Sequence, residues 1–61
     1  MKIERFNVVE LKDKNRATIL EIKGKKYLAE IVNPYGITLG IKTVTKDDID
    51  KVIYYKNNIR K

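Results

Sequence analysis

The stretch that determines the fold is Tyr27-Leu28-Ala29-Glu30-Ile31-Val32-Asn33-Pro34-Tyr35-Gly36-Ile37-Thr38-Leu39-Gly40-Ile41-Lys42-Thr43-Val44. It consists of two runs rich in β-branched and apolar residues, with Asn33-Pro34-Tyr35-Gly36 between them. Asparagine at the first position, proline at the second and glycine at the fourth favour a type I turn followed by a glycine bulge. The stretch therefore predicts a β-hairpin.

Apolar side chains alternate with polar ones on both sides of this turn. Side chains of a strand point to opposite faces in turn, so residues two apart share a face. Gly40, on the other face of the second strand, favours a bend or a close backbone approach. The alternating apolar residues are Tyr27, Ala29 and Ile31 before the turn, and Ile37, Leu39 and Ile41 after it.

Further strand patterns lie outside the hairpin. The polar residues Asp13-Lys14-Asn15 predict a tight first turn, in which Asn15 tolerates the left-handed conformation, and Gly24 predicts a second turn. Thr45 can cap a short 3₁₀ turn, with Asp47 and Asp48 near its positive end. The remaining strands are predicted at Val8–Lys12, Arg16–Ile22 and Lys51–Tyr55.

The second of these strands does not alternate perfectly. Its sequence is Arg16-Ala17-Thr18-Ile19-Leu20-Glu21-Ile22, in which apolar residues fall on both faces. Two interpretations stay open: both faces are partly covered, or a β-bulge shifts the phase near Leu20-Glu21.

The order of strands and turns resembles an SH3-like barrel. The amino-acid sequence of four segments resembles a family of short uncharacterised bacterial SH3-like barrel proteins. The resemblance runs from about Val8 to Tyr54, and family members usually carry a glycine in the first turn, where this chain has Asn15. It implies an all-β fold: a small five-stranded SH3-like barrel with a short 3₁₀ turn before the last strand. The segments that carry it are Val9-Glu10-Leu11-Lys12, Arg16-Ala17-Thr18-Ile19, Tyr27-Leu28-Ala29-Glu30-Ile31, and Thr45-Lys46-Asp47-Asp48-Ile49 with Val52-Ile53.

Length and composition predict one domain over residues 1–61, with a core over about 6–55 and a basic tail at 56–61. The resemblance implies no established activity. More distantly, the fold looks like KOW-type barrels and small basic archaeal chromatin barrels, which bind nucleic acid. This chain lacks the tryptophan wedge of the chromatin type.

Most catalytic side chains are missing from the chain. It contains no histidine, cysteine, serine or tryptophan, so it can form neither a Ser–His or Cys–His nucleophile nor a Cys/His zinc site. The acidic cluster of Asp47, Asp48 and Asp50 lacks the ligand spacing of a calcium loop, and capping of the 3₁₀ turn explains it better. We therefore expect a binding module, not an enzyme, with no cofactor and no metal.

The chain carries a net charge of +6, with fourteen cations against eight anions. One interpretation is attraction to nucleic acid or another polyanion. The other is genome composition, because eleven of the cations are lysine, and isoleucine and asparagine are also abundant. Arginine, which base readout and phosphate clamping favour, occurs only three times.

Two turns carry most of the candidate nucleic-acid contacts. In an SH3-like barrel we expect these two turns to lie at the same end, so that six cations converge and neutralise phosphates without reading sequence. An exposed tyrosine at the hairpin tip could stack on a base, whereas Tyr27 is interpreted as a packing residue. The candidate residues are Lys12, Lys14, Arg16, Lys23, Lys25, Lys26 and Tyr35.

An alternative function is a protein–protein interaction or regulatory module that uses a strand edge. Such a module could be a monomer, a weak homodimer or an immunity- or antitoxin-like partner. The residues Met1 to Arg5 contain no apolar segment, and no apolar run is long enough to cross a membrane. We therefore expect a cytoplasmic protein.

Overall fold

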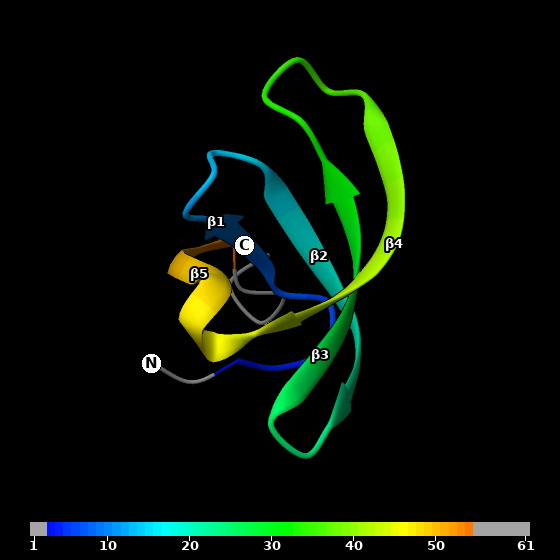
Figure 1. Cartoon of the computed structure of the whole chain (residues 1–61), viewed down its shortest axis with the longest axis vertical. Helices are drawn as coiled ribbons and strands as arrows, with labels where there is room; N and C mark the ends of the chain where they lie inside the picture. Colours follow the sequence, from blue (N-terminus) through cyan, green and yellow to red (C-terminus); the bar gives the residue numbers. More distant parts are fainter. Residues whose placement is uncertain (1–2, 55–61) are drawn as a thin grey trace, which may run out of the picture.

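The computed structural model describes residues 3–54 and contains five strands and one 3₁₀ turn (Figure 1). All neighbouring strands are antiparallel and form one sheet with the order β4-β3-β2-β1-β5. No helix within the described residues has the length and apolar character needed to cross a membrane. The elements are β1 (Val8–Leu11), β2 (Arg16–Lys23), β3 (Lys26–Val32), β4 (Thr38–Thr45), the 3₁₀ turn η1 (Lys46–Asp48) and β5 (Ile49–Tyr54).

The predicted all-β class, the five strands and the short 3₁₀ turn before the last strand are confirmed. Most boundaries agree to within one residue, and the last strand begins two residues earlier than predicted, at Ile49. The bulge interpretation for the second strand holds, because the β2–β3 register shifts between Ile19 and Glu21. The predicted basic tail at 56–61 lies outside the described residues.

The β3–β4 turn has the predicted geometry. The Gly36 amide donates to the Asn33 carbonyl (2.9 Å), and the Asn33 amide donates to the Ile37 carbonyl (2.9 Å). The Asn33 side-chain oxygen accepts from the amides of Tyr35 (2.9 Å) and Ile37 (3.0 Å). Gly36 has φ +88°, a conformation that glycine adopts without steric cost.

The first turn differs from the prediction in one respect. Lys14, with φ +78°, takes the left-handed conformation expected of Asn15. Asn15 instead donates its amide to the Asp13 carboxylate (3.0 Å), and its carbonyl accepts from the Leu11 amide (2.8 Å). Asp13, the first residue of the predicted turn, thus holds the turn through its side chain. As a result the left-handed residue is Lys14, one position before Asn15.

Strand β4 breaks the alternation predicted for Ile37, Leu39 and Ile41. Ile31 pairs with Gly40 and Val32 pairs with Thr38, so Leu39 is the extra residue of a bulge. The side chains of all three apolar residues are exposed, by 59%, 45% and 60% respectively. These three residues therefore lie outside the core cluster.

The core consists of buried side chains from all five strands. Ala29 and Ile31 of β3 are buried, as their shared face predicts, and Tyr27 packs against the core while staying half-buried. Burying aliphatic side chains is the main stabilising term for so small a chain. The buried apolar residues are Val9, Leu11, Ala17, Ile19, Ala29, Ile31, Val44 and Ile49.

The connection between β4 and β5 requires strong curvature. These strands are the two edges of the sheet, and in a flat sheet four strand spacings would separate them by about 19 Å. Only the three residues of η1 join them, and such a turn rises by roughly 2 Å per residue. The edges must therefore approach each other near η1, although no strand pairing joins β4 to β5 within the described residues.

Candidate functional site

The six candidate cations do not converge. The β1–β2 turn precedes β2 and the β2–β3 turn follows it, so the two turns lie at opposite ends of that strand (Figure 1). The eight residues of β2 span about 23 Å at roughly 3.3 Å per residue. The expectation of a single basic cluster is wrong, because successive turns of an antiparallel meander alternate between its two ends. The six side chains are all exposed, with Lys12, Lys14 and Arg16 at one end and Lys23, Lys25 and Lys26 at the other.

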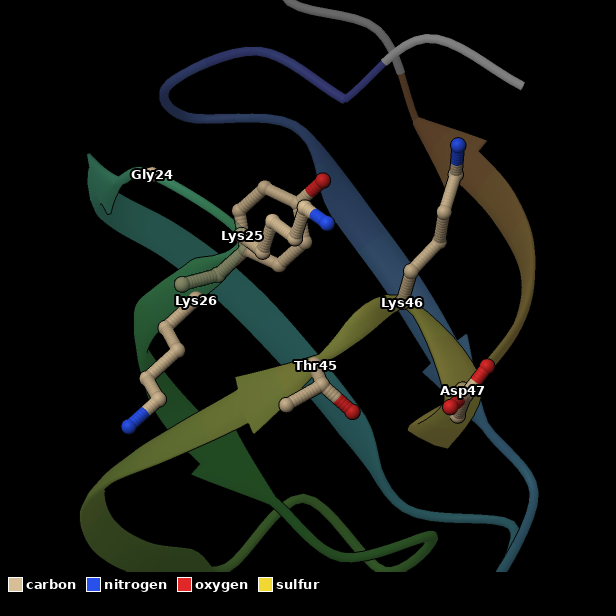
Figure 2. A pocket seen from close by; sticks show the side chains of 7 residues that line it. Gly24, Lys25, Lys26, Thr45, Lys46 and Asp47 are labelled. Atoms are coloured by element: carbon tan, nitrogen blue, oxygen red, sulfur yellow. The ribbon is translucent and has the colours of Figure 1, made fainter.

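A pocket of about 570 Å³ lies at the second of these ends. We call it the lysine pocket. Its volume falls within the range of small-ligand sites. Figure 2 shows Lys25 and Lys26 on one side of the pocket and Lys46 on the other, with the ammonium groups of Lys26 and Lys46 directed away from each other. The lining residues are Gly24, Lys25, Lys26, Tyr27, Thr45, Lys46 and Asp47.

Strand register brings the lining together. Lys26 at the start of β3 pairs with Thr45 at the end of β4, and Tyr27 pairs with Val44. The β2–β3 turn has a positive φ only at Gly24 (+61°), its first central residue, as in a type II′ turn. Lys25 follows directly, so that the tight turn holds its backbone at the rim of the pocket.

The 3₁₀ turn η1 and the residue before it form the second wall of the lysine pocket. The Asp48 carboxylate accepts from the Thr45 amide (2.9 Å) and the Thr45 hydroxyl (3.3 Å), which is the predicted capping role. This carboxylate is therefore committed to the backbone, and Asp47 is the acidic residue that lines the pocket. Within residues 3–54, no three acidic side chains gather closely enough to hold a metal ion.

The lysine pocket is electropositive. Its lining contains three lysines and one aspartate, which gives a local charge of about +2 at neutral pH. Among the described residues, the ion pair between Lys51 and Glu10 (3.7 Å) involves none of the three pocket lysines. The charges of Lys25, Lys26 and Lys46 are therefore available to an external anion.

The surface between the β1–β2 turn and η1 has a mixed charge. A smaller hollow of about 180 Å³ there is lined by Leu11, Lys12, Asp13, Asp47 and Asp48, and it shares Asp47 with the lysine pocket. Three carboxylates thus line this hollow with a single ammonium group, and their field offsets the attraction of Lys12 for anions. This hollow is a poorer anion site than the lysine pocket.

Tyr35 is 87% exposed, as predicted for the hairpin tip. It lies beyond Val32, and Val32 pairs with Arg16. The tyrosine therefore belongs to the end of the first turn and cannot act together with the lysine pocket.

Only Lys25 and Lys26 of the pocket lining belong to the residues predicted from the sequence. Of the other five, Lys46 and Tyr27 matter most for binding, and the sequence predicts them only as part of the 3₁₀ turn and as a packing residue. The pairing of Lys26 with Thr45 brings Lys46 beside the β2–β3 turn. Lys46 directly follows β4, whose partner β3 begins with Lys26, and Tyr27 is the second residue of β3.

Comparison of the chain with protein-family profiles, with curated proteins and with solved structures finds no significant match.

Proposed function

We propose that this protein is a non-catalytic binding module that contacts nucleic-acid phosphates through the lysine pocket. The observation that carries the proposal is the pocket lining, in which three lysines free of ion pairs outnumber one carboxylate. The overall charge of +6 adds long-range attraction to any polyanion. The absence of histidine, cysteine and serine supports binding over catalysis.

We also propose that the sheet closes as an SH3-like barrel. Two features support this: the strand order β4-β3-β2-β1-β5, and the three-residue η1 that joins the two edge strands. Long-range nuclear Overhauser effects between the end of β4 and the start of β5 would test it. In this fold the lysine pocket lies where the edges approach, so closure and the pocket depend on the same curvature.

The proposed contact is insensitive to sequence. Lysine acts on phosphate as a point charge, whereas base readout relies on arginine, asparagine or glutamine. The pocket lining contains none of these three residue types. Phosphate neutralisation of this kind gives affinity that depends strongly on salt.

The test is a titration of ¹⁵N-labelled protein with a short random single strand and its duplex, at low and moderate salt. We expect amide shifts at Gly24–Tyr27 and Thr45–Asp47 that disappear as salt rises. Shifts centred on Lys12–Arg16 would move the site to the other end. Absence of shifts at low salt would remove the proposal and leave the charge as a compositional bias.

A second candidate function is pairing of the β4 edge with a protein strand. The specific observation is that β4 is an unpaired edge of the described sheet. It carries one charged residue, Lys42, and Leu39 and Ile41 are exposed. An edge strand with exposed apolar residues and a single charge has little protection against strand addition.

The dependence of binding on salt concentration distinguishes the two proposed functions. Self-association through β4 should strengthen or stay constant as salt rises, because salt screens the repulsion between two copies of charge +6. Nucleic-acid binding should weaken. Sedimentation equilibrium of the protein alone at low and high salt measures the first effect, and a monomer at all concentrations would exclude self-pairing.

A further inference from the structure

We propose that the lysine pocket accepts an unpaired nucleotide, with Tyr27 stacking on the base and Lys25, Lys26 and Lys46 neutralising the adjoining phosphates. This inference rests on the proposed function and narrows it to single-stranded nucleic acid. The juxtaposition that carries it is a half-buried tyrosine that lines the same pocket as three lysines.

The core holds the Tyr27 side chain in place, and the pocket leaves part of it accessible to a ligand. Its side chain packs against the core cluster and also lines the pocket. Its strand neighbours are Ile22 on β2 and Val44 on β4, which anchor it from both sides. A ring already fixed in this way loses little conformational entropy when a ligand stacks on it.

The lysines around Tyr27 indicate that phosphate groups adjoin the stacked base. Lys26 and Lys46 lie on opposite sides of the pocket, with their ammonium groups directed away from each other (Figure 2). Their flexible four-carbon side chains can turn toward a phosphate that binds between them. An aromatic surface flanked by ammonium groups matches a planar base joined to phosphates. Sites of this composition bind single strands through stacking and backbone neutralisation.

A duplex fits this arrangement poorly. Its bases are stacked on both faces and paired at their edges, so reaching Tyr27 requires extrusion of a nucleotide, which costs a few kcal/mol. A single strand presents its bases without this cost. Because the lining has no asparagine, glutamine or arginine, little discrimination among the four bases is expected.

The experiment compares three fluorescein-labelled probes of about eight nucleotides by fluorescence anisotropy: a single strand, an abasic single strand with the same phosphates, and a duplex. We expect the full-length protein to bind the single strand about tenfold more tightly than the abasic strand, because stacking contributes roughly 1–3 kcal/mol per base. The duplex should bind with an affinity near that of the abasic strand.

Two variants assign the effect to Tyr27. Tyr27→Leu should lower the affinity for the single strand about tenfold and leave the abasic strand unchanged, whereas Tyr27→Phe, which keeps the ring, should retain the preference. Circular dichroism checks that each variant is folded. If the leucine variant does not fold, the three probes on the unmodified protein still decide the question.

The outcomes separate this inference from the proposed function. Equal affinity for the single, abasic and duplex probes, with steep salt dependence, would overturn the nucleotide site and keep the phosphate-binding function. An equal loss for all probes in Tyr27→Leu would likewise assign Tyr27 a structural role only. No salt-dependent binding of any probe would overturn both.

Discussion

Replacing Ile31 by aspartate is expected to unfold the protein. Ile31 is 3% exposed and belongs to the core cluster, and its strand partners are Ala17 and Gly40, neither of which offers a positive charge. A buried carboxylate without a partner costs several kcal/mol. A domain of this length has a total stability of roughly 3–9 kcal/mol. Loss of the dispersed amide spectrum and of the thermal transition would report unfolding.

The matched control is Ile41→Asp, which makes the same chemical change one strand away. Ile41 is 60% exposed and lies opposite Glu30 on the other face of the hairpin, so its carboxylate stays in water. We expect this variant to fold, with a loss of about 1 kcal/mol from lower strand propensity and repulsion by Glu30. A folded Ile31→Asp protein would show that the assignment of β3 faces is wrong.

Removing the three charges of the lysine pocket is expected to abolish most of the salt-dependent affinity for single strands. Each phosphate contact contributes about −0.7 to the slope of log K against log salt. The triple variant Lys25→Gln, Lys26→Gln and Lys46→Gln should therefore make the slope shallower by about 2. If the two proteins bind equally at 1 M salt, this difference in slope makes the affinity of the variant roughly 100-fold lower at 0.1 M salt.

A second triple variant serves as the control. Lys12→Gln, Lys14→Gln and Arg16→Gln remove the same net charge from the opposite end of β2, where carboxylates already offset the cations. Its slope should stay close to that of the unmodified protein. Equal slopes for the two variants would indicate a diffuse attraction by total charge and would argue against a defined pocket. Both are measured by anisotropy over a series of salt concentrations.

Local turn chemistry made much of the fold predictable. Asn33 and Gly36 determine the β3–β4 turn through contacts within five residues, so sequence alone contains the information. The bulge at Leu39 could not be predicted in the same way. It arises from the pairing of Ile31 with Gly40 and Val32 with Thr38, and alternation within one strand gives no information about its partner's register.

The candidate site was less predictable than the fold. The lysines of the β2–β3 turn were identified as candidates because they are dense in the sequence. Lys46 lies twenty residues beyond Lys26 and joins it only through the β3–β4 register. The grouping of Lys12 with Lys25 failed for a topological reason, since one strand separates their turns. Tyr27 has the pattern of a core residue, and only three-dimensional packing leaves part of it open to the pocket.

The position of β5 has a consequence for how the chain folds. Strands β1 to β4 pair with their neighbours in sequence, whereas β5 pairs with β1, joining Leu11 to Ile49. Closing this long loop has a larger entropic cost than closing any of the hairpins, and this cost grows with the logarithm of loop length. The hairpins can form early and independently. The β1–β5 ladder, by contrast, joins residues that lie far apart in the sequence, and contacts of this kind slow folding.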